Sequence, residues 1–186
     1  MMQTLVSFLS ETASRRVKNI WGFVESQCRN GARQSLSNPY FVWICGQKFP
    51  LKSLSNTISE LSDSIKPFTI HATGLGIFPG PQPTLYIPIV KTEQLYNLQH
   101  QIWSRFKELG YHPNQEYQPD AWVPGIPFTR GTLTRESLSK ILKQLAFEEI
   151  NLKITIDNLA FFDQSEGVKF SYPLKPVSQP TDPDTQ

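Results

Sequence analysis

Residues 67–90 read Pro-Phe-Thr-Ile-His-Ala-Thr-Gly-Leu-Gly-Ile-Phe-Pro-Gly-Pro-Gln-Pro-Thr-Leu-Tyr-Ile-Pro-Ile-Val, and this stretch decides the fold class. Phe68–Thr73 and Thr84–Val90 are rich in β-branched and aromatic residues, which is typical of strands. Gly74–Pro81 lies between them and is dense in glycine and proline, so we expect a turn-rich link there. The stretch therefore predicts two strands in the middle of the chain.

The residues before this stretch predict two more strands and two helices. Thr4–Leu9 and Tyr40–Cys45 are short runs of strand formers. The helices are marked by apolar residues at helical spacing: Val17, Ile20, Trp21 and Val24 for the first, and Leu54, Ile58, Leu61 and Ile65 for the second. Ser10 or Thr12 caps the first helix, and the second stops before Pro67 because the residue before a proline disfavours helix.

The residues after this stretch predict two further helices. Thr92 caps the third helix, which ends at Gly110, and Thr134 caps the fourth. Their apolar stripes are Leu95, Leu98, Ile102 and Phe106 in the third helix, and Leu138, Ile141, Leu142 and Leu145 in the fourth. Between them, Tyr111–Pro127 is a long connection that ends in a loop-rich strand. The last strands expected are Leu152–Ile156, which Asn158–Phe162 continues, and Val168–Tyr172.

Composition indicates one globular domain over residues 1–175, because 39% of the 186 residues are hydrophobic and 18% are charged. Residues 176–186 are polar and contain three prolines, so we expect a disordered C-terminal tail. The net charge of +2 neither requires nor excludes a nucleic-acid partner. Cys28 and Cys45 form no pair motif and are expected to be reduced thiols of a cytoplasmic protein. We expect no membrane span, no metal site and no cofactor, because no long apolar run or metal-ligand spacing occurs.

Several pieces of the sequence together resemble one family. The pieces are Pro67-Phe68-Thr69-Ile70, Gly74-Leu75-Gly76-Ile77-Phe78, Thr84-Leu85-Tyr86-Ile87-Pro88 and Tyr117-Gln118-Pro119-Asp120-Ala121-Trp122-Val123-Pro124. In order and spacing they are similar to the 2H phosphoesterases, the superfamily of 2′-5′ RNA ligase-like proteins, from the first strand to about Phe162. The resemblance implies an α+β fold of two lobes, in which antiparallel sheets face a central cleft and helices pack outside.

The same resemblance implies one His-x-Thr/Ser motif in each lobe. One imidazole takes a proton from the attacking oxygen and the other protonates the leaving oxygen, while the hydroxyls donate to the phosphate. This sequence departs from that pattern at all four positions. Tyr40 and Val42 stand at the first motif, and Gly125 and Pro127 stand at the second. We therefore expect no catalytic residue at these positions, and we expect Tyr40 to fill part of the space near Gly125.

Five residues are candidates for binding a ligand: Tyr40, His71, Tyr86, Trp122 and Arg130. His71-Ala72-Thr73 matches the motif by its letters but lies in another strand, so His71 is either part of a rebuilt site or a strand histidine on a polar face. Trp122 either lines the cleft rim or anchors its loop, and the guanidinium of Arg130 is suited to holding a phosphate.

Two functions follow from these observations. The first is a non-catalytic homologue, a monomer by itself, that binds a protein partner or holds a nucleotide or RNA end in the cleft. The second is a residual phosphodiesterase for cyclic or 2′-5′-linked nucleotides, with a site rebuilt around His71, Tyr40 and Arg130. The apolar side chains of Val42 and Pro127 favour a protein partner or a purely structural role.

Overall fold

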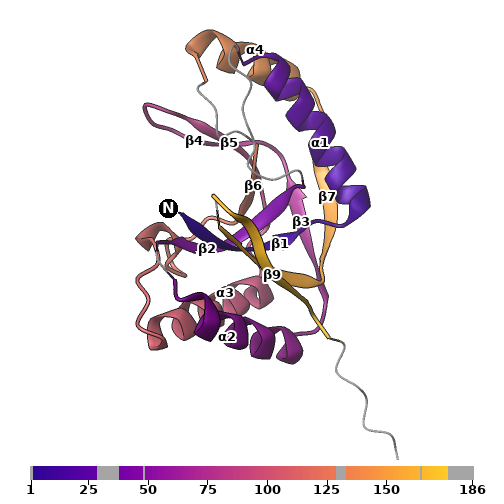
Figure 1. Ribbon diagram of the computed structural model, residues 1–186. Coiled ribbons are helices and arrows are strands. Elements are labelled where there is room, and N and C mark those ends of the chain that lie inside the picture. The colour runs from indigo at the N-terminus through magenta and orange to yellow at the C-terminus, as the bar shows by residue number, and fades with distance from the viewer. Residues whose placement is uncertain (1, 29–37, 48, 129–132, 164, 176–186) are drawn as a thin grey trace, which may run out of the picture.

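The computed structural model describes residues 2–28, 38–47, 49–128, 133–163 and 165–175 (Figure 1). The expected tail over residues 176–186 and the candidate Arg130 lie outside these residues. The helices are α1 (Glu11–Ser26), α2 (Leu51–Ser64), α3 (Glu93–Glu108) and α4 (Arg135–Leu145), with a 3-10 turn at Gln115–Tyr117. The strands are β1 (Gln3–Phe8), β2 (Tyr40–Gly46), β3 (Phe68–Thr73), β4 (Gly76–Phe78), β5 (Thr84–Pro88), β6 (Gly125–Pro127), β7 (Asn151–Ile156), β8 (Asn158–Asp163) and β9 (Gly167–Pro173). The α+β fold class is therefore confirmed.

The first sheet has the strand order β2-β1-β8-β9, and all of its neighbours are antiparallel. Helices α2 and α3 lie along one side of it, where α3 contacts β2 and α2 contacts β8 and β9 (Figure 1). Alternate residues of β2, Phe41 and Trp43, are fully buried in the main hydrophobic core together with Phe161 of β8. Sheet alternation therefore places Tyr40 and Val42 on the opposite side of β2.

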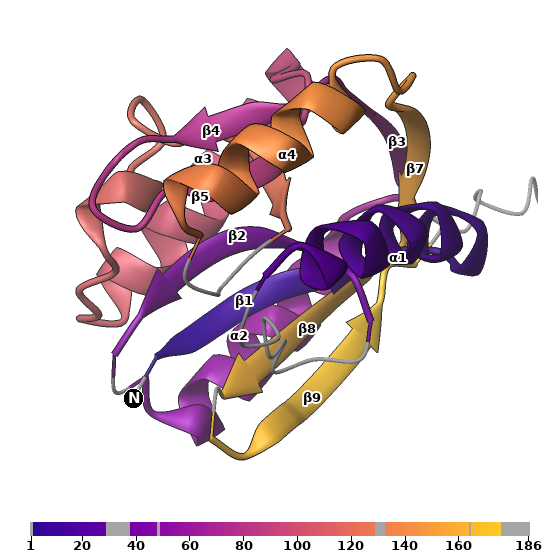
Figure 2. The same cartoon turned by 90° about the horizontal axis from the view of Figure 1, so that it is seen from above.

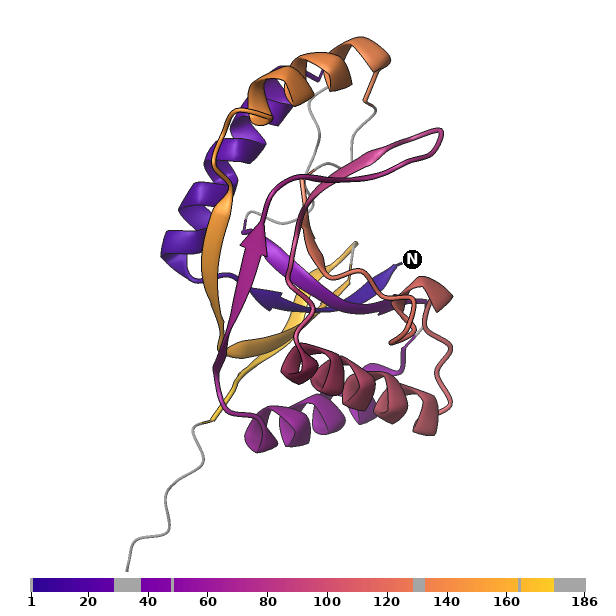
Figure 3. The ribbon, with the colours of Figure 1, turned by 180° about the vertical axis from the view of Figure 1, so that it is seen from behind.

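The second group of strands consists of the pair β3-β7 and the three-stranded sheet β4-β5-β6. A bridge between Ala72 and Ile89 joins β3 to the end of β5, so the four strands run in the order β7, β3, β5, β6. Helices α1 and α4 lie on the side of β3 and β7 (Figures 2 and 3), and α1 contacts β7. The first sheet, listed from its other edge, has the corresponding order β9, β8, β1, β2. Each group thus has four neighbouring strands, and β2 and β6 lie at corresponding ends.

Two expectations about the strands are wrong. The link Gly74–Pro81 contains the short strand β4, which pairs with β5 as a hairpin; three residues are too few for a periodicity in the sequence to reveal. Residues Asn158–Phe162 do not continue β7 but form β8 between β1 and β9. The burial patterns explain the change, since β7 alternates between buried and exposed residues, whereas β8 is buried on both faces as a central strand.

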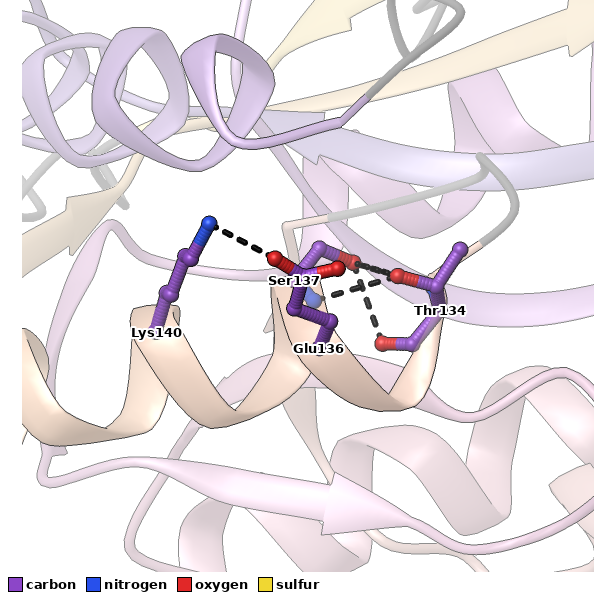
Figure 4. A network of polar contacts seen from close by, with 4 residues as sticks. All are labelled: Thr134, Glu136, Ser137 and Lys140. Carbon is purple, nitrogen blue, oxygen red and sulfur yellow. Dashed lines mark hydrogen bonds and ion pairs between the residues drawn. The ribbon is translucent and has the colours of Figure 1, made fainter.

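The expected caps of the third and fourth helices are confirmed. The side chain of Thr92 accepts a hydrogen bond from the backbone N–H of Leu95, and Gly110 follows α3 with a φ of 76°. At α4, Thr134 and Ser137 cap each other reciprocally, and an ion pair between Glu136 and Lys140 follows (Figure 4). Of the two cap candidates for the first helix, Ser10 occupies the position, although its side chain makes no capping hydrogen bond.

The carboxylate of Asp163 closes the turn between β8 and β9. It accepts hydrogen bonds from the hydroxyl and the backbone N–H of Ser165 and from the side-chain amide of Gln3 on β1. These bonds favour the ionised form and lower the pKa of Asp163 to about 2, with the Ser165 hydroxyl as the largest cause. The turn and the start of β1 thus depend on one charged side chain.

Among the described residues, no helix is long and apolar enough to cross a membrane.

We predict that Asp163→Asn flattens the acid unfolding profile. The folded-state pKa of Asp163 lies below its unfolded value, so its contribution to stability is present above about pH 4 and is lost as the pH falls toward 2. The variant should lose about 1 to 3 kcal/mol at pH 7 and little more between pH 4 and pH 2. Urea midpoints at pH 7, 4, 3 and 2 measure this. Asp63→Asn, which removes an exposed carboxylate, is the control; identical acid profiles for Asp163→Asn and the wild type would contradict the prediction.

Candidate functional site

The two strands that carry the motif positions, β2 and β6, lie in contact with each other. The indole of Trp122, three residues before β6, packs against β2. Its ring centroid lies 5.6 Å from that of Phe41 and 6.0 Å from that of Trp43, and it is stacked on the latter. Trp122 is buried, so of its two expected roles the structure places it as an anchor of the loop. The packing of Trp122 thus brings Tyr40 and Gly125 onto neighbouring strands.

A set of polar contacts fixes the loop that leads into β6. The ammonium of Lys91 donates to the carbonyl oxygens of Pro119 at 2.7 Å and Trp122 at 3.2 Å. It also lies over the rings of Tyr96 and Trp122. The hydroxyl of Tyr96 donates to Asp120, and this hydrogen bond raises the pKa of Tyr96. Sequence reasoning missed Lys91 and Tyr96, because only the tertiary structure brings α3 beside the loop.

Tyr40 begins β2 and is 5% exposed. It belongs to a small hydrophobic cluster with Val6 of β1 and Ala160 of β8, against which Val42 also packs. Its ring centroid lies 6.4 Å from that of Phe162. Tyr40, which the sequence resemblance aligns with the first histidine, is therefore part of an apolar layer on the first sheet.

Gly125 begins β6, and the ring of Tyr86 from β5 occupies the space beside it. A Cβ atom at position 125 would lie 2.5 Å from Cδ2 of Tyr86 and 3.1 Å from the carbonyl oxygen of Ile87. The same ring covers Gly76 of β4 and stacks on Phe78, with the centroids 4.3 Å apart. We expected Tyr40 to fill this space, but the atoms that the structure places there belong to Tyr86 and Ile87. A glycine is required at 125 as long as Tyr86 keeps this position.

His71 lies on the same face of the second group of strands as Gly125, at a distance. It is exposed in β3 and faces Lys153 of β7. The register places Thr73, Pro88 and Gly125 in one row across β3, β5 and β6, and His71 lies two residues further along β3. Two strand spacings alone separate β3 from β6 by about 10 Å. The structure thus brings Tyr86 to Gly125 and leaves His71 apart from Gly125.

Among the residues that the structure describes, no three His, Cys, Asp or Glu side chains group so that they could hold a metal ion. Val42 and Pro127, which the sequence resemblance aligns with the motif hydroxyls, offer no side-chain donor.

The family model described as "2'-5' RNA ligase superfamily" matches residues 41–168, more than two thirds of the chain. The chain belongs to this superfamily. A curated relative, the RNA 2',3'-cyclic phosphodiesterase of Methanothermobacter thermautotrophicus, is 24% identical over 102 residues. That match covers 54% of this chain and spans about half the length of the relative, 54%.

A solved structure, described as "Crystal structure of phosphoesterase", is similar to this superfamily member along most of both chains. It superposes with a TM-score of 0.60 over 94% of this chain and 98% of the other, at 13% sequence identity. At that identity the likeness concerns the fold alone. The fold expected from the sequence motifs is thus confirmed.

We predict that Gly125→Ala destabilises the protein by about 1 to 3 kcal/mol, because the new methyl group overlaps the ring of Tyr86. In a Tyr86→Ala background the cost should fall, which gives a coupling energy of about 0.5 to 3 kcal/mol. Urea unfolding of the four proteins of this cycle measures it. Gly22→Ala in α1 meets open space, so it is the control and should be neutral or stabilising. Equal costs in both backgrounds would show that Tyr86 does not occupy this space.

We predict that Lys91→Met loosens the loop before β6. Loss of the two hydrogen bonds to Pro119 and Trp122 should cost about 1 to 2 kcal/mol. The variant should also increase quenching of tryptophan fluorescence by acrylamide, since Trp122 would become more accessible. Lys52→Met, on the exposed side of α2, is the control and should stay within about 0.5 kcal/mol of the wild type. Unchanged stability and quenching in Lys91→Met would rule out an anchoring role for this lysine.

Proposed function

We propose that this superfamily member is a non-catalytic, cytoplasmic protein that binds a partner, and that both of its motifs are degenerate. The observation that carries the proposal is the ring of Tyr86 beside Gly125, which leaves no space for a side chain at the second histidine position. A positioned acid or base is worth typically about 10²- to 10⁴-fold in rate. A chain that lacks both imidazoles therefore loses nearly all of the catalysis that such a site provides.

The surroundings of Tyr40 support the same proposal. A phenol has an ordinary pKa near 10, so it is a poor base at pH 7. Tyr40 is buried beside Val6 and Ala160, whereas a general base has to lie within hydrogen-bond reach of its substrate. The changes at both motifs replace one imidazole with the phenol of Tyr40, the other with no side chain at Gly125, and the hydroxyls with the apolar Val42 and Pro127. These side chains suit binding more than proton transfer.

The alternative is a residual phosphodiesterase with a site rebuilt around His71, Tyr40 and Arg130. The geometry of the described residues gives it little support, because His71 lies about 10 Å or more from β6, well beyond the roughly 3 Å reach of a proton-transfer contact. Arg130 lies outside the described residues. The activity named for the Methanothermobacter relative nevertheless supplies the substrate class against which the proposal is tested.

We predict no opening of 2′,3′-cyclic nucleotides by this protein above the rate in buffer. Ring opening followed by chromatography over several hours measures it, with the Methanothermobacter phosphodiesterase as positive control. Wild type and His71→Ala should give the same background rate. If the wild type opens the cyclic nucleotides and His71→Ala does not, the non-catalytic proposal is wrong and a rebuilt site at His71 is established.

A further inference from the structure

We propose that the second group of strands docks an extended, uncharged segment of a protein partner on the face of β4, β5 and β6 that carries Gly125. This inference rests on the proposed binding function and names its partner class. The face, here called the apolar face, is defined by five side chains: Phe78, Tyr86, Pro88, Val90 and Val123.

The strand register places these side chains together. Tyr86 lies between Gly76 of β4 and Pro127 of β6, and Pro88 lies opposite Gly125. The backbone pairing continues past the ends of both strands, because the N–H of Ile89 donates to the carbonyl of Pro124. Val90 and Val123 therefore follow on the same face as Pro88 and Gly125. The result is a surface across three strands on which glycines alternate with apolar side chains.

An aromatic pair anchors the apolar face. The rings of Phe78 and Tyr86 are parallel within 15°, and Phe78 is 43% exposed. Val90 and Val123 are exposed to a similar degree. Exposed aromatic side chains that neighbouring groups hold rigid lose little entropy on binding, and such residues are enriched at the centres of protein interfaces. The stack is thus suited to accept an apolar anchor residue of a partner.

The charge distribution selects the kind of partner. The chain has 34 Asp, Glu, Lys and Arg residues among its 186, from 16 acidic and 18 basic, yet residues 67–90 and 121–128 contain none. A nucleic-acid surface needs basic side chains along the backbone path. The five side chains of the apolar face include none, and His71 and Lys153 lie beside Val90 at its border, on β3 and β7. A charged peptide would lose hydration there without gaining an ion pair. An uncharged segment is therefore favoured.

The edge of the sheet favours an extended segment over a second copy of the chain. Among the described residues, β4 pairs only with β5, so its other edge is available for strand addition. The strand is three residues long and Pro79 follows it. Such a short edge can pair with a peptide that continues over the apolar face, whereas a stable symmetric dimer usually buries about 1,600 Å².

A selection from a phage library of random 12-residue peptides tests the proposal on the full-length protein. Peptides retained by the wild type should be uncharged around an aliphatic or aromatic anchor. Measured by fluorescence polarisation, their Kd should rise at least tenfold in Phe78→Ser and in Val123→Lys, which leaves the aromatic stack intact. Phe147→Ser is the matched control, because Phe147 is 91% exposed at the end of α4, and its Kd should equal that of the wild type.

Four results would overturn the proposal. These are selected peptides that are predominantly charged, a Kd that neither face variant changes, a wild-type dimer in sedimentation that Phe78→Ser dissolves, and tighter binding of a 12-nucleotide single-stranded RNA through Phe78. Turnover of cyclic nucleotides is measured separately. If the protein turns over cyclic nucleotides and also binds the peptides through the apolar face, the non-catalytic function is wrong and the docking proposal is still supported.

Discussion

The packing of Trp122 against Phe41 and Trp43 is the contact on which the rest of this structure depends. It joins the loop before β6 to the buried side of β2, and thereby connects the two groups of strands near their motif positions. Large aromatic side chains bury much apolar area in a small volume, so three of them in contact make a strong local core. Lys91 and Tyr96 hold the same loop from outside through its carbonyl oxygens and Asp120.

This junction has a consequence for the chemistry. The alternation of a strand requires that Tyr40 and Val42 lie opposite Phe41 and Trp43, and that Gly125 and Pro127 lie opposite the buried Ile126. We propose that the strands which position the two imidazoles of the family motifs are retained, and that the side chains at Tyr40, Val42, Gly125 and Pro127 have changed. Tyr86, held between Gly76 and Gly125, turns one of these positions into a covered, uncharged surface.

Much of the fold could be predicted because local signals and tertiary packing agree. Thr92, Gly110 and Thr134 act as caps through hydrogen bonds and backbone conformations within one helical turn. The failures concern one very short strand and one pairing between distant segments. β4 is too short to show a period, and Asn158–Phe162 resembles an extension of β7 until its pairing with β1 is known. The role of Tyr86 was missed because no pattern in the sequence shows which residue packs beside a glycine of the neighbouring strand.

The sequence by itself determined the family and the α+β class, since these depend on composition, spacing and order along the chain. Only the tertiary structure decided that Tyr86 lies beside Gly125, that His71 lies two strands away from it, and that Lys91 holds the loop of Trp122. For the first two, the physical reason is the sheet register, which brings together residues 39 positions apart, from 86 to 125. For Lys91, the reason is the packing of α3 beside the loop that precedes β6. A one-residue change in that register would turn every side chain to the other face.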